Sequence, residues 1–321
     1  MAEYKLINSN QLDYDAFSNL QRKAYANLLK KLDYSDRYMT PEFYKWKFHP
    51  PAGSAKVSLV YEDNCLVSGN AIIPLEFQYG LNTLYGWQAC DAATLAYAQR
   101  KGYSSDCLQM QLDDLKNNQF LYVFPNKDSI PFVKKKKFQN KGLIATWIKT
   151  SYLIKKRTSP DIFKIEKFDN DIDQLTRNLA NCGKVVISRS AKYLNWRYSH
   201  HPVFQYVSFV YKKENRYQGF SVVRNVNFGN RKIAVVMELW GLNSTIKKLL
   251  LRSVAHWARK QDIKIILFQD NNQTLLGGVQ IGFIYMPSFL LPKKQFLMVF
   301  GKLKSYTKYN WWIQFGDWDG F

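Results

Sequence analysis

Hydrophobic and polar residues alternate along this chain in segments that fit helices and strands in turn. Between Asp13 and Leu32 the apolar residues recur at helical spacing, which predicts an amphipathic helix. Three apolar or alternating runs then predict strands at Lys56–Tyr61, Leu66–Phe77 and Thr83–Cys90. After a loop from Asp91 to Gly102, the pattern predicts a helix over Ser104–Lys116, a strand at Phe120–Phe124, a short helix over Ser129–Lys137 and a strand at Phe138–Ile148.

The same succession returns in the second half of the chain. It predicts strands at Tyr206–Tyr211, Gln218–Val226 and Lys232–Trp240, a helix over Thr245–Lys260, a strand at Ile263–Phe268 and further strands after Gly282-Phe283. At an offset of 150 residues, two expected helix N-caps coincide, Thr40 and Ser190. In the same register, Trp46-Lys47-Phe48 lies on Trp196-Arg197-Tyr198, Val57–Tyr61 lies on Val207–Tyr211, and Gly69 lies on Gly219.

This repeat predicts two copies of one α/β unit, because one register holds from a helix cap through two strands. We place the first copy at residues 1–150 and the second at 151–321, divided near the basic, polar stretch 155–160.

The copies differ after their third strands, where copy one has a loop that copy two has lost. This loop contains Gln99-Arg100-Lys101-Gly102-Tyr103-Ser104 at a strand-to-helix junction. Helix N-terminal amides, a glycine that permits close backbone approach and two cations together suit a pyrophosphate. Taken alone, the pattern also fits a basic surface turn without a ligand.

Composition adds a strong positive charge to this picture. The 321 residues include 46 Lys and Arg against 25 Asp and Glu, which gives a formal net charge of +21 and favours polyanionic partners. A hydrophobic content of 46% excludes a disordered chain, and the 16% of aromatic residues can also stack on nucleotide bases. Nucleic-acid binding is an alternative, but the chain lacks a helix-turn-helix, zinc or RRM signature, so no nucleic-acid partner is expected.

Cysteine and histidine residues give no metal or redox signature. The four cysteines show no C-x-x-C spacing and the four histidines are scattered, so we expect no metal and reduced, buried thiols. No apolar run approaches the ~20 residues of a membrane span. The chain start also lacks the pattern of a signal peptide, so we expect a cytoplasmic protein without a membrane span.

The loop and its surroundings resemble the GNAT superfamily of N-acyltransferases, with two GNAT units in tandem. Gln99 and Gly102 match its signature (Gln/Arg)-x-x-Gly-x-(Gly/Ala), and Ser104 replaces the last small residue. Phe124-Pro125-Asn126 and Phe138 fall where the superfamily has a strand, an Asn and the start of a later strand. The resemblance implies an α/β (α+β) fold of two tandem domains, each a mixed, mostly antiparallel sheet flanked by helices.

The same resemblance implies acyl-CoA as the co-substrate, bound by copy one. The expected donor-binding residues are Ala92, Ala93, Thr94, Gln99, Arg100, Lys101, Gly102, Tyr103, Ser104 and Asn126. Copy two keeps no signature, so we expect it to hold the acceptor rather than acyl-CoA.

Within the superfamily, the chain is similar to sugar N-acyltransferases of bacterial lipopolysaccharide or capsule biosynthesis. The similarity is carried by residues 43–48, 125–129, 193–198 and 315–319. It implies a dTDP-linked amino-dideoxy sugar as the acceptor and 3-hydroxybutanoyl-CoA as a candidate donor. Tandem-GNAT transferases of the Fem type, which use aminoacyl-tRNA, are an alternative, but their donor does not need the phosphate loop.

Asp91 is the candidate catalytic residue, because it ends the third strand where the superfamily places the thioester carbonyl. Its carboxylate can accept the proton of the attacking amine or hold the ammonium group, although an Asp that closes a turn is the alternative. The backbone N–H groups of Asp91 to Ala93 are expected to polarise the carbonyl. Val133 stands where many members have a Tyr as general acid. No Cys or Ser has a neighbouring His, so we expect direct attack without an acyl-enzyme.

Copy two offers three candidate acceptor-binding residues, Trp196, Arg197 and Glu238. An indole stacks on a base, and a guanidinium binds a diphosphate through two parallel hydrogen bonds. Core packing is the alternative for Trp196, since the Trp is repeated at position 46. A paired structural role is equally compatible with Glu238, which lies within an apolar strand.

Overall fold

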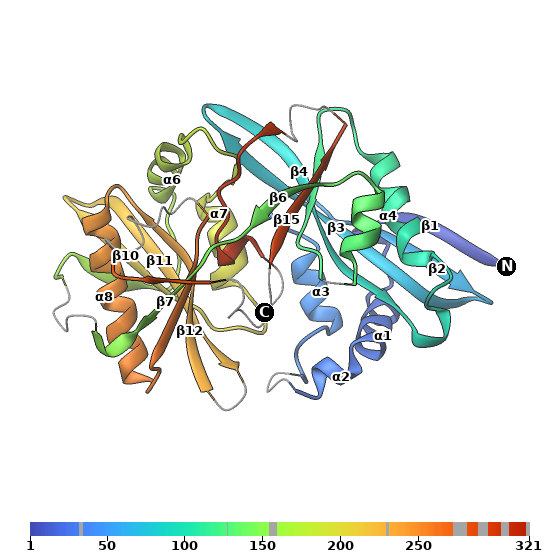
Figure 1. Cartoon of the computed structure of the whole chain (residues 1–321), viewed down its shortest axis with the longest axis horizontal. Coiled ribbons are helices and arrows are strands. Elements are labelled where there is room, and N and C mark those ends of the chain that lie inside the picture. The colour runs from blue at the N-terminus through green and yellow to red at the C-terminus, as the bar shows by residue number, and fades with distance from the viewer. Residues whose placement is uncertain are drawn as a thin grey trace. The chain divides into compact units, whose positions relative to one another are not determined.

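The computed structural model describes residues 1–31, 35–126, 128–153, 159–228, 231–271, 281–287, 295–302 and 308–318. The chain forms two compact units. Figure 1 shows the chain coloured from blue at the N-terminus to red at the C-terminus. Unit 1 comprises Met1–Phe77, Leu84–Lys141 and Leu297–Tyr309. Unit 2 comprises Gln78–Thr83, Gly142–Phe296 and Asn310–Phe321.

Unit 1 is built on a mixed sheet with the strand order β1-β2-β3-β4-β5-β15-β6. Its neighbouring strands β1, β2 and β3 pair antiparallel, β4 and β5 pair parallel, and β15 runs antiparallel to β5. The strands are β1 (Ala2–Asn8), β2 (Lys56–Glu62), β3 (Cys65–Tyr79), β4 (Asn82–Thr94), β5 (Phe120–Val123), β6 (Gln139–Leu143) and β15 (Phe296–Gly301). The helices are α1 (Tyr14–Ala24), α2 (Ala26–Leu29), α3 (Pro41–Lys47), α4 (Tyr103–Asp114) and α5 (Ile130–Lys135), with short 3₁₀ turns at η1 (Ser9–Gln11) and η2 (Ala96–Ala98).

Helices cover both faces of this sheet. A Cβ atom on Gly69 of β3 would lie 3.2 Å from Phe17 and 3.3 Å from Leu20 of α1, so α1 packs closely on this side of the strand. Ile72 on the same strand belongs to a buried apolar cluster with Leu108 and Leu112 of α4. Because residues 69 and 72 of a strand point to opposite faces, α1 and α4 pack on opposite sides of the sheet.

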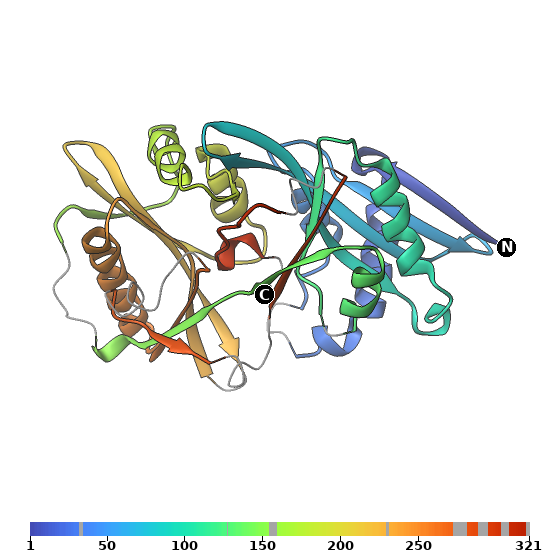
Figure 2. The same ribbon diagram turned by 45° about the horizontal axis from the view of Figure 1, so that its top comes forward.

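Unit 2 is built on a second mixed sheet with the order β14-β7-β13-β12-β11-β10-β8, in which β12 and β13 pair parallel and the other described neighbours pair antiparallel. Helix α8 lies on one face, and α6 and α7 lie on the other (Figure 2). The strands of this sheet are β7 (Thr146–Thr150), β8 (Ile162–Ile165), β10 (Val207–Lys213), β11 (Arg216–Phe228), β12 (Arg231–Gly241), β13 (Ile265–Gln269) and β14 (Ile284–Met286), and the short strand β9 (Val186–Ile187) lies outside it. The helices are α6 (Ile172–Ala180), α7 (Ala191–Leu194) and α8 (Ser244–Lys260), with short turns at η3 (Ser151–Leu153), η4 (Asn195–Ser199) and η6 (Phe315–Asp317).

The predicted fold class is confirmed, since the chain is a mixed α/β protein with two mostly antiparallel sheets flanked by helices. Both expected N-caps are present. The Thr40 hydroxyl oxygen accepts a hydrogen bond from the Phe43 N–H, and the Ser190 hydroxyl oxygen accepts one from the Tyr193 N–H. These short helices, α3 and α7, therefore begin in the same way.

Two predicted elements were wrong in their extent. The single strand expected at Phe138–Ile148 is two strands, β6 and β7, which belong to different sheets; Gly142, near the end of β6, has a φ of +105°. The single helix expected from Asp13 to Leu32 is interrupted at Tyr25, where the backbone leaves helical geometry; Leu32 lies outside the described residues.

The two units also differ from the two halves of the sequence. Strand β7 precedes residue 151 but pairs with β13 of unit 2, whereas β15 comes late in the chain and pairs with β5 of unit 1. Each sheet therefore contains a strand from the opposite half of the sequence, because strand pairing, rather than chain order, decides where these segments lie.

Candidate active site

The neighbouring parallel strands β4 and β5 separate at the carboxyl edge of the unit 1 sheet. Their pairing runs only from Gly86 opposite Phe120 to Gln88 opposite Tyr122, while β4 continues to Thr94. Gly86 is required here, because a Cβ atom at this position would clash with the ring of Phe120. Residues 89–94 of β4 thus extend beyond their pairing with β5, at the edge where open α/β sheets bind ligands.

Asp91 bends β4 beyond the end of its pairing with β5. Its φ is +51°, in the left-handed region that non-glycine residues rarely adopt. Three side chains donate hydrogen bonds to three consecutive carbonyl oxygens: Gln21 Nε2 to Asp91 O at 2.7 Å, Tyr25 Oη to Ala92 O at 2.6 Å, and Ser68 Oγ to Ala93 O at 3.1 Å. The surrounding structure therefore holds the bend in place.

The Asp91 side chain makes a buried ion pair with Lys47. Lys47 Nζ lies 2.6 Å from Asp91 Oδ2, and the two side chains are 3% and 9% exposed. The ammonium group offsets the carboxylate charge in a setting that excludes most water. In copy two, the equivalent positions hold Arg197 and Gly241, so this pair is specific to unit 1.

Tyr25 is close enough to this pair for the two charges to act on its phenol. Burial raises the pKa of Tyr25, the Asp91 carboxylate raises it further, and Lys47 opposes them. The hydroxyl therefore stays protonated and remains a hydrogen-bond donor to the Ala92 carbonyl. Sequence patterns did not reveal the contacts of Gln21, Tyr25 and Lys47, because each residue lies far along the chain from Asp91.

The predicted phosphate loop lies at the start of α4, as the strand-to-helix pattern indicated. Gly102 is the N-cap, with a φ of +91°, and no side chain caps this end. The first amides of an α-helix have no partner within the helix, so those of Tyr103 and Ser104 can meet an anion. The Ser104 carbonyl accepts a hydrogen bond from Asn70 Nδ2 at 3.0 Å, which ties the first turn to β3.

The charged residues of the loop have different partners. Arg100 is exposed, with a φ of +66°, whereas Lys101 Nζ lies 2.8 Å from Glu62 Oε1. Tyr103 also donates a hydrogen bond to this carboxylate, and hydrogen bonds from Lys101 and Tyr103 lower the pKa of Glu62. Gln99 donates to the Thr94 carbonyl at 3.3 Å, so it closes the loop onto the end of β4.

Asn126 and Val133 lie at the start and within α5. The Asn126 side-chain oxygen accepts hydrogen bonds from the N–H groups of Asp128 and Ser129 at 3.1 and 2.8 Å, so this side chain orders the turn that leads into the helix. Val133 is buried in the apolar cluster of α4 and β5. A donor contact by Asn126 remains a prediction.

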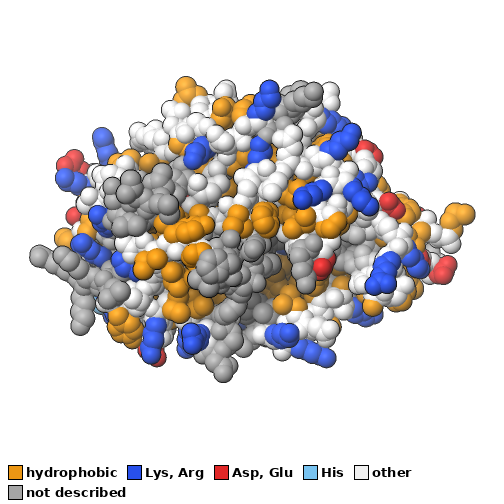
Figure 3. Space-filling model, in the orientation of Figure 1, with side chains coloured by type: hydrophobic (Ala, Val, Ile, Leu, Met, Phe, Trp, Pro, Cys, Tyr) orange, Lys and Arg blue, Asp and Glu red, His pale blue; other side chains and the backbone are white. Residues whose placement is uncertain are grey.

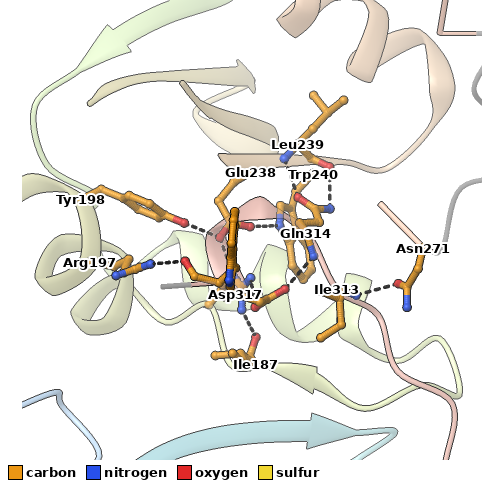
Figure 4. Close-up of polar contacts among 12 residues, drawn as sticks. Ile187, Arg197, Tyr198, Glu238, Leu239, Trp240, Asn271, Ile313, Gln314 and Asp317 are labelled. Carbon is orange, nitrogen blue, oxygen red and sulfur yellow. Dashed lines mark hydrogen bonds and ion pairs between the residues drawn. The ribbon is translucent and has the colours of Figure 1, made fainter. Parts of the chain in front are cut away.

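Unit 2 has an equivalent separation of parallel strands, but its own chain fills it. Strands β12 and β13 pair from Ile233 opposite Ile265 to Val236 opposite Phe268, and β12 then continues. Beyond that point, Leu239 N donates to Gln314 Oε1 at 2.9 Å, and Gln314 Nε2 donates to Leu239 O at 3.4 Å (Figure 4). The Gln314 carboxamide therefore takes the place of a neighbouring strand.

The segment that carries Gln314 is also held by Asn271, the second residue after β13. Ile313 N donates to Asn271 Oδ1 at 2.7 Å, and Asn271 N donates to Ile313 O at 3.3 Å (Figure 4). Every residue from Trp311 to Trp318 is buried. The strand ends of unit 2 are thus closed, while residues 89 to 92 of β4 are half-buried or exposed.

Glu238 lies in a closed polar cluster under this segment. Its carboxylate accepts hydrogen bonds from Tyr198 Oη at 2.5 Å, Trp240 Nε1 at 2.8 Å and Arg189 Nε at 3.0 Å, and Arg189 also pairs with Asp317 (Figure 4). Glu238 is completely buried. The carboxylate is thus hydrogen-bonded by three side chains of the protein, and a contact with substrate remains a prediction.

Trp196 and Arg197 lie in η4, the turn that follows α7. Trp196 is only 9% exposed and packs against Tyr193 with ring centroids 5.7 Å apart. Arg197 is half-buried, and its Nη2 donates to the Trp318 carbonyl at 2.8 Å. The structure thus places Arg197 beside Trp318 and packs Trp196 against Tyr193.

Lysine and arginine side chains are spread over the face of the molecule drawn in Figure 3, with fewer acidic side chains among them. Among the described residues, no group of three or more His, Cys, Asp and Glu side chains could hold a metal ion. In the same part of the chain, no helix has the length and apolar character needed to cross a membrane.

Comparison with known proteins connects the chain by fold alone. No protein-family model and no curated protein matches the sequence. A GCN5-related N-acetyltransferase from Anabaena variabilis superimposes with a TM-score of 0.68 at 10% identity, over 94% of this chain and 74% of that one. A probable N-acyltransferase from Enterococcus faecalis gives a TM-score of 0.68 at 13% identity, over 93% and 72%. The N-myristoyltransferase of Saccharomyces cerevisiae, solved with bound myristoyl-CoA, gives 0.61 at 9% identity, over 92% and 82%. The chain has the fold of GCN5-related N-acetyltransferases.

Proposed function

We propose that this protein transfers an acyl group from acyl-CoA to an amine, with the donor bound in unit 1. The difference between the two units carries the proposal. In unit 1 the strand ends past Gln88 are accessible and lead to a glycine-capped helix start at Gly102, whereas in unit 2 the strand ends are sealed by Gln314.

The proposed donor lies along β4. The amides of residues 100–104 hold its pyrophosphate, and Arg100 and Lys101 supply counter-charges. Asn126 follows in the chain at the separation that the superfamily pattern implies. Its pantetheine runs beside residues 89–91. Ala89 corresponds to Leu239 at an offset of 150 residues. The backbone of Leu239 pairs with the carboxamide of Gln314, and we propose that the backbone of Ala89 pairs with an amide of the pantetheine in the same way.

The proposed reaction is a direct attack within a ternary complex. The amine nitrogen bonds to the thioester carbonyl carbon, the amides of Ala92 and Ala93 stabilise the oxyanion, and the carbon–sulfur bond then breaks to release CoA thiolate. Asp91 holds the incoming ammonium or takes its proton, and solvent protonates the thiolate, since Val133 offers no acid. Cys107 is unsuited to form an acyl-enzyme, because burial raises the pKa of its thiol to about 12.

The proposed acceptor is a dTDP-linked amino-dideoxy sugar of bacterial lipopolysaccharide or capsule synthesis in the cytoplasm. Unit 2 binds it through the guanidinium of Arg197, with Trp196 beside it and Glu238 supporting the surrounding fold. Donor and acceptor are both polyanions, which the net charge of +21 attracts.

The direct test measures free thiol released from acetyl-CoA and 3-hydroxybutanoyl-CoA in the presence of a panel of dTDP-amino sugars. We expect release that depends on one of these acceptors and initial-rate plots that intersect. Parallel plots together with a trapped acyl-protein would refute direct transfer, and no thiol release with any amine would refute the acyl-transfer proposal.

A further inference from the structure

Side chains hold three neighbouring peptide groups at the bend of β4, beyond its pairing with β5. The carbonyl oxygens of Asp91, Ala92 and Ala93 accept hydrogen bonds from Gln21, Tyr25 and Ser68 in turn. Gln21 and Ser68 are completely buried. Such contacts fix each peptide plane, because a buried polar group that loses its partner is costly.

The orientation of these carbonyls determines where the following N–H groups point. A trans peptide is planar, and its C=O and N–H lie on opposite sides of the chain. The carbonyl of Asp91 faces Gln21 of α1, so the N–H of Ala92 points away from α1. For the same reason the N–H of Ala93 points away from Tyr25, and both amides are directed away from the helix that orders them.

We infer that Gln21 and Tyr25 are positioning residues, which aim the backbone amides of Ala92 and Ala93 at the thioester carbonyl of the donor. The inference rests on the proposed function, since it assumes that acyl-CoA lies along β4. Neither side chain needs to touch the donor, because each acts through the peptide group whose carbonyl it holds. The interruption of the helix at Tyr25 has a purpose in this arrangement, since it brings the phenol to Ala92.

The neighbouring charges agree with this role. An oxyanion that develops at Ala92 and Ala93 would be repelled by a lone carboxylate at Asp91. Lys47 Nζ lies 2.6 Å from that carboxylate and offsets its charge. The amides can therefore stabilise negative charge beside Asp91 without an opposing field.

The test uses Tyr25→Phe, which removes one hydroxyl and keeps the ring. The matched control is Tyr4→Phe in the same unit, whose hydroxyl donates to Asp106 rather than to β4. Acetyl-CoA labelled with ¹³C at its thioester carbonyl is bound to each protein, and the carbonyl stretch is recorded by difference infrared spectroscopy alongside calorimetric affinity. Gln21→Met serves as a second variant if Tyr25→Phe does not fold.

In the wild type and Tyr4→Phe, we expect the bound carbonyl band at lower frequency than in free acetyl-CoA. In Tyr25→Phe the shift should shrink, the dissociation constant should change less than about twofold, and kcat with an accepted amine should fall by about tenfold, less than the loss of a direct oxyanion donor. An unchanged band in both Tyr25→Phe and Gln21→Met would overturn the inference and leave the proposed function intact. If acetyl-CoA bound none of the proteins, the proposed function would fail, and the inference with it.

Discussion

Asp91 combines two features that are costly on their own, a left-handed backbone and a buried charge. Each has a specific partner: Gln21 donates a hydrogen bond to the Asp91 carbonyl oxygen, and the Lys47 ammonium group pairs with the Asp91 carboxylate. At the position that corresponds to Lys47 in the second half of the sequence, Arg197 donates a hydrogen bond to the carbonyl oxygen of Trp318. The residue-level chemistry of unit 1 therefore depends on side chains that come from α1 and α3.

Asp91→Asn should lower both stability and activity. The substitution leaves Lys47 buried without a counter-charge, which costs about 3 kcal/mol of unfolding free energy. Urea unfolding measures this loss. Lys47→Met combined with Asp91→Asn should recover most of the stability, because no buried charge remains, while kcat stays low. If the double variant regained full kcat, the pair would have no role in the reaction.

Glu62→Gln should tighten the binding of CoA. Glu62 now holds Lys101 of the phosphate loop, and without its negative charge the ammonium is available to the pyrophosphate. We expect the dissociation constant measured by calorimetry to fall by about two- to fivefold at low salt and by less at high salt. Glu3→Gln is the control, since Glu3 pairs with Lys5 on β1. Weaker binding in Glu62→Gln would mean that Lys101 does not meet the pyrophosphate.

The glycine-capped helix start at Gly102 was predictable from sequence, and the residues that hold Asp91 were not. Gly102 at the start of a helix is a local pattern, and the structure places it as the N-cap with positive φ. Gln21, Tyr25 and Lys47 reach Asp91 only through tertiary packing, so no local pattern marks them. Glu238 shows the opposite case, since its strand was predicted but its three hydrogen-bond donors come from distant segments.

At the scale of elements, the segment 311–318 decides what unit 2 can bind. It connects Leu239 beyond the end of the β12 pairing with Asn271 after β13 through the side chain of Gln314 and the backbone of Ile313. Gly316 fits beneath Glu238 and Tyr198 so closely that a Cβ atom there would clash with both. The strand edge of unit 2 is therefore closed. Unit 2 also contains the part of the sequence in which we expect no phosphate loop.

Gln314→Leu should destabilise unit 2 without changing donor binding. It leaves the buried N–H and carbonyl of Leu239 without their partner, which costs about 1–3 kcal/mol. Thermal unfolding and amide exchange at Leu239 report the effect, while calorimetry should give an unchanged affinity for CoA. Gln109→Leu on α4 is the control, because this half-buried side chain makes its hydrogen bonds with Asp113 and Lys136 of unit 1. Slow exchange at Leu239 in the variant would show that Gln314 is not its partner.

The extent of individual elements was the least predictable part of the fold. The third strand was expected to end at Cys90, yet β4 reaches Thr94, because Ser68 and Tyr25 hold its carbonyls beyond the bend. Residues 139–142 are polar and lead directly into the apolar run 143–148, and this pattern does not show that the chain changes sheets between Leu143 and Thr146. Repeat periodicity identified the elements, and tertiary pairing set their ends.

At the scale of the whole molecule, the two sheets end differently. Each unit contains a parallel strand pair that separates, and in each a late segment of the chain joins the unit, as β15 in unit 1 and residues 310–318 in unit 2. Only unit 1 keeps both the accessible strand edge and the helix start that suit a nucleotide donor. The large positive charge is common to both.

Arg197→Ala should separate the roles of the units in catalysis. If unit 2 binds the nucleotide sugar, the variant raises the KM for the dTDP-amino sugar by about tenfold and changes the KM for acyl-CoA little, as expected for lost binding of one substrate. Steady-state kinetics with each substrate varied in turn provide the measurement. Unchanged values of both constants would assign unit 2 a purely structural role.

The most direct test of the account is hydrogen–deuterium exchange of the wild-type protein with and without acetyl-CoA. The account predicts slower exchange in peptides that cover residues 89–94 and 100–104, and no change in those that cover residues 237–241, which Gln314 already protects. Protection of residues 237–241 by acetyl-CoA, or no protection at 89–94 and 100–104 at saturating concentration, would contradict it.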